Sequence, residues 1–260
     1  MYDQFAQYYD TFVNWPRRLD FEMPFLLSTL DQLGPARDKI KILDSACATG
    51  QHAIALAQEG FDVAGSDISH EMVSLANANA HAADQRIDFR TSGFGNTFAA
   101  FDKRRDFDAV LCLGNSLPHV ESIRALNKCL RDFSAMLKSA GIVFIQMHNF
   151  DCVMQEKKRW MEPLALSRSG KEWVFMRFYD FEPNGYLQFN ILTLEKEKHQ
   201  PWKSQLTSTR LFPITSNLLD SALHESGFED TSWYGSMAGD TFDNSASSDI
   251  VVIAKKKTSR

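Results

Sequence analysis

Cysteine is scarce in this sequence, and its spacing excludes the common zinc motifs. The four cysteines, Cys47, Cys112, Cys129 and Cys152, are scattered and never form a CxxC pair, so no metal site is expected. Most of them lie in apolar or helical contexts, which favours reduced, buried thiols. The chain also lacks an apolar run of membrane length, and residues 1–10 have no signal-peptide character. These absences indicate a cytoplasmic protein.

An excess of basic residues is missing as well. The chain has 28 Lys and Arg residues against 33 Asp and Glu residues, a net charge of −5. Nucleic acids and membrane surfaces select basic faces, so neither is an expected partner. No internal repeat or low-complexity segment is present, and a hydrophobic fraction of 44% supplies an ordinary core. A chain of 260 residues therefore suits one large α/β domain with an insertion.

The best-patterned stretch, residues 39–69, lacks both GxGxxG and the GK[ST] of a phosphate loop. Residues 40–44 predict a buried strand ending in Asp44, residues 45–50 are small, and residues 51–59 have helical apolar spacing. A second apolar strand ends at Asp67, where a carboxylate can accept both hydroxyls of an adenosine ribose. The expected ligand has a ribose but little negative charge, a description that S-adenosylmethionine fits.

Aromatic residues crowd the first 20 positions. Spacings of three and four place most of them on one side of a helix, which either packs on the domain or forms a lid over the cofactor. We favour the lid, because aromatic faces attract a sulfonium and an arginine fork suits a carboxylate. The residues concerned are Tyr2, Phe5, Tyr8, Tyr9, Phe12, Trp15, Arg17 and Arg18.

The remaining pattern predicts a Rossmann-like α/β fold. Strands are expected at 87–90, 107–113, 141–147, 228–234 and 249–254, and helices at 21–33, 69–83, 122–139 and 216–226. They complete a seven-stranded, mostly parallel sheet whose last strand is antiparallel, with helices on both faces. Alternating strands at 173–181, 186–194 and 202–212, with an Asn184-Gly185 turn, predict a small antiparallel insertion after the fifth strand.

Several polar or aromatic residues follow the predicted strands. In an open parallel sheet, ligands bind at the carboxyl ends of the strands, where Asn115 and His148 are expected. Phe94 either stacks on the adenine or fills the core. His119 is either a ligand-edge residue or a capping or surface histidine.

LDSACATG, SDIS and FDAVLCLGNS together resemble the class I S-adenosylmethionine-dependent methyltransferases. Within that class the chain is similar to the glycine and glycine/sarcosine N-methyltransferases, which share YDQxA, LDxACGTG, FDAVxCLGNSxxH and an HRNYD-like motif. The resemblance implies that Arg18 binds the methionine carboxylate of the cofactor and that Asp67 binds its ribose. It also implies that Asn115 lines the place where cofactor and acceptor meet. The candidate cofactor-binding residues are Trp15, Arg18, Asp44, Ala46, Ala48, Gly50, Asp67, Ile68, Phe94, Leu113, Asn115 and His119.

The sequence departs from the family pattern at three places. Ala48 replaces a glycine, Gly93-Phe94 replaces a polar-aromatic pair at the adenine, and His148 in MHNFD replaces the arginine that clamps the glycine carboxylate. Arginine and histidine differ in their hydrogen bonding to carboxylates, so the acceptor need not be glycine.

The expected protein is one methyltransferase domain over residues 1–260, with residues 1–20 as a lid and residues 151–213 as a substrate-side lid. It transfers the methyl group of S-adenosylmethionine to a small-molecule acceptor, with an amine favoured, and releases S-adenosylhomocysteine. Candidate catalytic residues facing the acceptor are His148, Asn115, Tyr179 and Tyr234. If the acceptor needs deprotonation, His148 is the best-placed base.

Three alternatives stay open. The chain could be a small-molecule O-methyltransferase or a non-catalytic cofactor-binding protein. An NAD-dependent oxidoreductase fits less well, because it requires GxGxxG. Relatives of the glycine enzymes form homo-oligomers, but no residues here specify an interface.

Overall fold

The computed structural model describes residues 2–34, 36–198 and 200–258. At positions 2–5 and 7 it describes the backbone alone, so the side chains of Tyr2 and Phe5, both counted among the lid aromatics, lie outside the described set. Within the described ranges, no helix combines the length and apolarity needed to cross a membrane.

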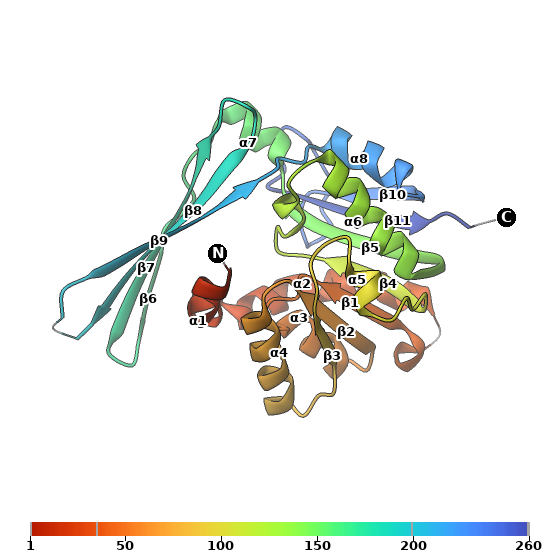
Figure 1. Cartoon of the computed structure of the whole chain (residues 1–260), viewed down its shortest axis with the longest axis horizontal. Coiled ribbons are helices and arrows are strands. Elements are labelled where there is room, and N and C mark those ends of the chain that lie inside the picture. The colour runs from red at the N-terminus through yellow and green to blue at the C-terminus, as the bar shows by residue number, and fades with distance from the viewer. Residues whose placement is uncertain (1, 35, 199, 259–260) are drawn as a thin grey trace.

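The main sheet has seven strands in the order β10-β11-β5-β4-β1-β2-β3 (Figure 1). β11 is antiparallel to both of its neighbours, while the pairs among β1 to β5 are parallel, as predicted. Its strands are β1 (Lys41–Ser45), β2 (Asp62–Asp67), β3 (Asp88–Thr91), β4 (Phe107–Cys112), β5 (Leu137–His148), β10 (Phe228–Tyr234) and β11 (Asp249–Lys256).

Two apolar cores lie on opposite faces of this sheet, because alternate residues of each strand point to opposite sides. In β1, Ile42 joins the core under α2 (Trp15–Leu30), α3 (Gln51–Gln58) and α4 (His70–Ala82). The next residue, Leu43, joins the core under α6 (Ile123–Met136) and α8 (Ser216–Glu225). Burial on both faces explains the nearly continuous apolar strands.

Local signals account for most helix ends. Ser69 caps α4 as predicted, and its Oγ accepts a hydrogen bond from the Met72 N–H at 3.1 Å. α2 begins at Trp15, earlier than predicted, because the Asn14 side chain caps it and Pro16 occupies its first turn. Three short elements, α5 (Thr97–Ala100), α7 (Phe150–Glu156) and β6 (Leu164–Arg168), were not predicted.

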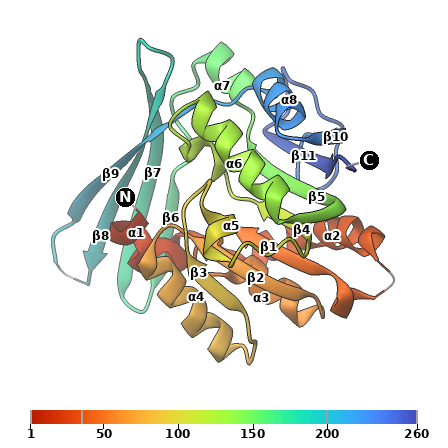
Figure 2. The same ribbon diagram turned by 45° about the vertical axis from the view of Figure 1, so that its right-hand side comes forward.

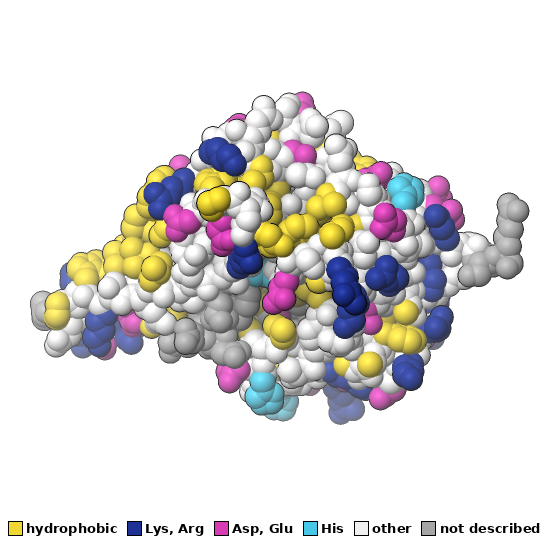
Figure 3. Space-filling model, turned by 45° about the horizontal axis from the view of Figure 1, so that its top comes forward, with side chains coloured by type: hydrophobic (Ala, Val, Ile, Leu, Met, Phe, Trp, Pro, Cys, Tyr) yellow, Lys and Arg dark blue, Asp and Glu magenta, His cyan; other side chains and the backbone are white. Residues whose placement is uncertain are grey.

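The insertion forms a separate antiparallel sheet in the order β6-β7-β8-β9. It contains β7 (Lys171–Phe181), β8 (Leu187–Glu197) and β9 (Lys203–Leu211), with the predicted Asn184-Gly185 turn between β7 and β8. Figures 1 and 2 show this sheet as an arm that projects away from the main sheet. Hydrophobic side chains gather on the arm in Figure 3, and the insertion carries the exposed Trp160, Trp202 and Leu206.

Helix α1 (Tyr2–Phe12) joins the two sheets. Tyr8, Tyr9 and Phe12 pack against the inner face of the arm, where the rings of Phe12 and Phe175 lie 5.2 Å apart. On the other side, the Asp10 carboxylate accepts hydrogen bonds from the Trp15 Nε1–H at 2.7 Å, the Thr49 hydroxyl at 2.6 Å and the Asn79 amide at 3.3 Å. The helix is therefore tied to the turn after β1 and to α4.

Candidate functional site

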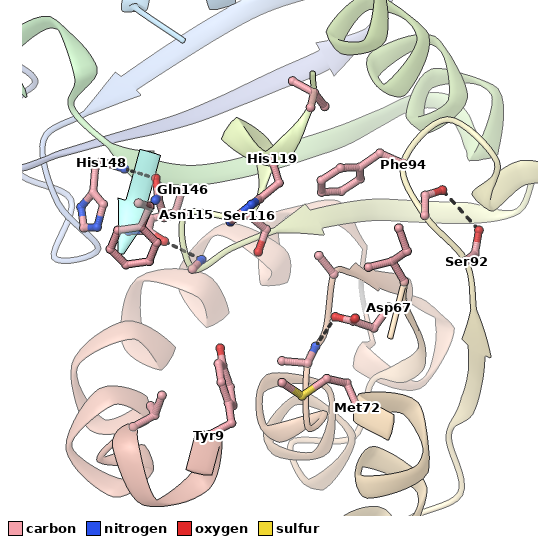
Figure 4. A pocket seen from close by; sticks show the side chains of 18 of the residues that line it. Tyr9, Asp67, Met72, Ser92, Phe94, Asn115, Ser116, His119, Gln146 and His148 are labelled. Atoms are coloured by element: carbon pink, nitrogen blue, oxygen red, sulfur yellow. Dashed lines mark hydrogen bonds between the residues drawn. The ribbon is translucent and has the colours of Figure 1, made fainter. Parts of the chain in front are cut away.

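A cavity of about 610 Å³ opens at the carboxyl ends of the central strands. Its volume lies in the range of small-molecule and cofactor sites. The main sheet supplies its floor, α1 contributes Tyr9 and Phe12, and the arm contributes Arg177, Phe189 and Ile191. Figure 4 shows Asp67, Met72, Ser92 and Phe94 on one side and Asn115, Gln146 and His148 on the other.

The Asp67 carboxylate is fixed by backbone donors at the end of β2. Its Oδ2 accepts from the Ala48 N–H at 2.9 Å and its Oδ1 from the Ser69 N–H at 2.9 Å. The side chain is 7% exposed and lines the cavity. A buried carboxylate held in this way at the carboxyl end of β2 suits the two hydroxyls of a ribose.

The turn after β1 brings backbone close to this carboxylate. Ala46, Ala48 and Gly50 have φ values of 61°, 49° and 79°, in the left-handed region. The two alanines each pay about 1–2 kcal/mol for that conformation. A Cβ on Gly50 would lie 2.8 Å from the Phe89 ring, so glycine is required there. Ala46 and Ala48 line the cavity, and their small side chains fit a closely approaching ligand.

Arg18 enters the cavity from α2 and is held by Glu22. The Arg18 Nε–H donates to Glu22 Oε1 at 3.0 Å, and His52 Nε2 lies 2.6 Å from Glu22 Oε2. Burial lowers the pKa of His52. Burial alone would raise the pKa of Glu22, but the bond to His52 and the Arg18 charge hold it below its ordinary value. A carboxylate thus orients the Arg18 guanidinium, which packs beside Gly114 and fits a ligand carboxylate.

On the opposite side of the cavity, polar groups interlock around Asn115. Its Oδ1 accepts from the His148 N–H at 3.0 Å, and the neighbouring Gly114 N–H donates to Gln146 Oε1 at 2.7 Å. Asn115 has a φ of 61°, so its backbone is also left-handed. His148 Nδ1 lies 3.4 Å from Asp249 Oδ1, because these two residues pair at the end of β5 and the start of β11.

The structure brings nine of the predicted site residues together. The predicted residues that line the cavity are Arg18, Ala46, Ala48, Asp67, Ile68, Phe94, Asn115, His119 and His148. Phe94 lines the cavity, and its ring centroid lies 6.1 Å from that of Phe133, so it also packs on the core. Stacking of Phe94 on the adenine stays a prediction. Burial lowers the pKa of His119 to about 4, so its imidazole is neutral.

The other predicted residues, Trp15, Asp44, Gly50, Leu113, Tyr179 and Tyr234, are not part of this lining. Trp15 is buried with its ring 5.3 Å from the Arg18 guanidinium. Tyr234 does not face the acceptor side, because its ring packs on Phe25 at 4.9 Å beneath α2. Tyr179 is 2% exposed in the cluster around Phe150.

Sequence analysis missed other lining residues. Gln146, Arg177 and Asp249 lie within or at the start of strands, where their polarity resembles an ordinary exposed position. Glu22 lies in a helix predicted only for its apolar face. Within the described ranges, no cluster of three or more His, Cys, Asp or Glu side chains could hold a metal ion.

We expect Asp67→Asn to raise the Kd for S-adenosylhomocysteine about 100-fold, because it removes a charged acceptor for the ribose hydroxyls and directs an NH₂ group toward a backbone donor. Calorimetric titration measures the effect. The control is Asp62→Asn, at the exposed start of the same strand. An unchanged Kd in a folded Asp67→Asn protein would remove Asp67 from the cofactor site.

Asp44 should make stability depend on pH. Burial, with the Asp67 charge, raises its pKa from 3.8 to about 7, and its Oδ2 has no hydrogen-bond partner among the described residues. The folded state therefore binds more protons than the unfolded chain between these values, and the Asp44 contribution to the free energy of unfolding falls as pH rises through them. Thermal unfolding across this interval should show the Tm of Asp44→Asn rising relative to wild type. A pH-independent Tm difference would contradict this assignment.

Comparisons with known proteins agree with this geometry. A family model described as a methyltransferase domain matches residues 42–141. A glycine/sarcosine N-methyltransferase from Aphanothece halophytica is 31% identical over 239 residues, covering 89% of this chain and 80% of that protein.

Two solved structures share the fold. An S-adenosylmethionine-dependent methyltransferase from Clostridium acetobutylicum superposes with a TM-score of 0.77 at 15% identity, over 98% of this chain and 99% of that chain. An amino pentose methyltransferase from Micromonospora echinaspora, with bound S-adenosylmethionine, superposes with a TM-score of 0.70 at 17% identity, over 97% and 95% of the two chains. Given this fold and a relative that is similar along most of both sequences, the chain belongs to the class I S-adenosylmethionine-dependent methyltransferases.

Proposed function

We propose that the protein transfers a methyl group from S-adenosylmethionine to the amine nitrogen of a small molecule. The observation that carries this proposal is the Asp249 carboxylate on the cavity wall beside His148, together with the rings of Tyr9, Phe12 and Phe189. A carboxylate and aromatic faces both favour a group that gains positive charge. An amine gains that charge when it is methylated.

When bound, S-adenosylmethionine would supply a methyl group on a positively charged sulfur: a new bond from the amine nitrogen to the methyl carbon would replace the carbon–sulfur bond, whose electron pair stays with sulfur, and the methylated amine would release a proton. The residues of the chain bind the cofactor and the acceptor and orient them toward each other. Arg18 and Asp67 provide a cation and a hydroxyl acceptor for the cofactor. We expect α1 and the arm, which both contribute lining residues, to limit access of water. Orientation in a water-poor cavity supplies most of the rate acceleration for such a displacement.

The compared proteins support an amine acceptor. The Aphanothece halophytica relative is named for glycine and sarcosine, and the Micromonospora echinaspora enzyme for an amino pentose. Both names describe acceptors with an amine nitrogen, although the two molecules differ in size and in charge. From these names we therefore infer only that the acceptor of this protein carries an amine.

A second candidate function is methylation of a hydroxyl. The His148 imidazole lies 3.4 Å from the Asp249 carboxylate, an arrangement that can orient a histidine as a general base. A hydroxyl must lose its proton during attack, whereas a neutral amine does not.

The proposed function is tested by incubating the protein with S-adenosylmethionine and a panel of amines, alcohols and phenols, followed by mass spectrometry. We expect products heavier by one CH₂ unit from amines. Products from hydroxyl compounds alone would favour the second candidate. Cofactor binding without any product would indicate a non-catalytic protein.

We expect His148→Gln to separate the two chemistries. On an amine, kcat/KM should fall roughly tenfold through lost hydrogen bonding, whereas loss of a general base on a hydroxyl would cost about 10²–10⁴-fold. His224→Gln, a change of a half-exposed histidine on α8, is the control. An unchanged kcat/KM for the amine would remove His148 from the site.

A further inference from the structure

The inner face of β7 carries three buried donors that have no hydrogen-bond partner within the described residues, and the Trp173 Nε1–H is one of them. The Arg177 Nε–H and the Tyr179 hydroxyl are both buried and make no hydrogen bond there. Because alternate residues of a strand share a face, both point to the same side of the arm. An unmatched buried donor costs about 1–3 kcal/mol. Among these β7 side chains it is Arg177 that lines the cavity, and a ligand bound there can supply the acceptor that its Nε–H lacks.

Arg177 differs from the other arginines near it. Arg159 pairs with Asp180 at 2.5 Å and Arg210 pairs with Glu182 at 2.7 Å. No carboxylate of the described residues lies within ion-pair distance of Arg177, whose guanidinium lies 5.3 Å from the centre of the Phe12 ring. Burial lowers the pKa of Arg177, but guanidinium stays charged under all ordinary conditions. A desolvated charge of this kind requires a counter-ion.

The cavity thus receives two guanidinium groups from different elements. Arg18 of α2 is oriented by Glu22 beside Gly114, and we assign it to the single carboxylate of the cofactor. Arg177 enters from the arm next to Ile191, its cross-strand neighbour on β8. Arg177 needs an anion of its own as counter-ion. Because the cofactor carboxylate is assigned to Arg18, the methyl acceptor is the ligand that can supply this anion.

We propose that Arg177 binds a carboxylate of the methyl acceptor and selects acceptors that carry one. This inference rests on the proposed function and narrows it to amines with an anionic group. The amine lies on the side of Asp249, and the carboxylate bonds to the Arg177 guanidinium. Arginine suits this role because its fork of donors matches a planar carboxylate.

A binding experiment tests the site without requiring catalysis. The complex with S-adenosylhomocysteine is titrated with acetate, acetamide and methyl phosphate, followed by NMR. Acetate should bind wild type about tenfold more tightly than acetamide, and Arg177→Met should abolish the difference. Arg177→Lys should retain part of it. Tighter binding of methyl phosphate than acetate, with the same dependence on Arg177, would assign the anion as a phosphate.

The matched control is Arg159→Met, which removes a half-exposed guanidinium from the same insertion. It should leave the acetate preference unchanged. Tyr179→Phe should also leave the preference unchanged, because Tyr179 lies on the same face of β7 but outside the cavity lining.

A kinetic experiment then compares acceptors that differ in one charge, such as glycine and glycinamide. Arg177→Met should lower kcat/KM for the carboxylate at least tenfold and leave the amide unchanged. If no amine is methylated while acetate binding still depends on Arg177, the proposed function fails and the anion site stands.

Three results would overturn the inference. The first is an Arg177→Met variant that keeps the preference for acetate over acetamide. The second is an equal loss of S-adenosylhomocysteine affinity, which would place Arg177 at the cofactor. The third is a lower Tm with unchanged binding and kinetics, which would reduce Arg177 to a stacking partner of Phe12.

Discussion

The rest of the site depends on one buried carboxylate, that of Asp67. It accepts the Ala48 and Ser69 N–H groups and so ties the turn after β1 to the start of α4. Without these bonds, a carboxylate that is 7% exposed would be too costly to keep ionised. Its charge in turn raises the pKa of the neighbouring Asp44, whose burial already disfavours ionisation. The cofactor side is therefore a small network in which each charge affects the next.

Two further carboxylates, those of Glu22 and Asp10, hold Arg18 and α1 in place at the cavity. Glu22 is buried but accepts bonds from Arg18 and His52, which fixes the arginine at the floor. Asp10 binds three donors from α2, the turn after β1 and α4, and thereby fixes α1 over the site. The aromatic side of α1 then has the arm as its partner, since Phe12 packs on Phe175. The cavity is therefore lined by segments that lie far apart in the sequence.

Arg177 does not share this pattern of paired charges. Arg159 and Arg210 of the insertion pair with Asp180 and Glu182, whereas Arg177 lines the cavity with the Phe12 ring beside its guanidinium. A fold can retain such a group when a ligand completes its coordination, because the cost of the unmatched donor is recovered on binding. In the site that we propose for the acceptor, Asp249 and Arg177 contribute opposite charges.

The sequence by itself determined the sheet and its longer elements, because strand patterns, the Ser69 cap and the Asn184-Gly185 turn act over a few residues. The short α5, α7 and β6 were not predicted. It also located Asp67, Asn115 and His148, since parallel strands carry ligands at their carboxyl ends. Only the tertiary structure decided which side chains share the cavity. Tyr234 packs on Phe25 away from the cavity, whereas Arg177 and Asp249, which were not predicted, line it. The physical reason is that strand pattern assigns a residue to one of two faces, but the element packed against that face decides whether it meets core or ligand.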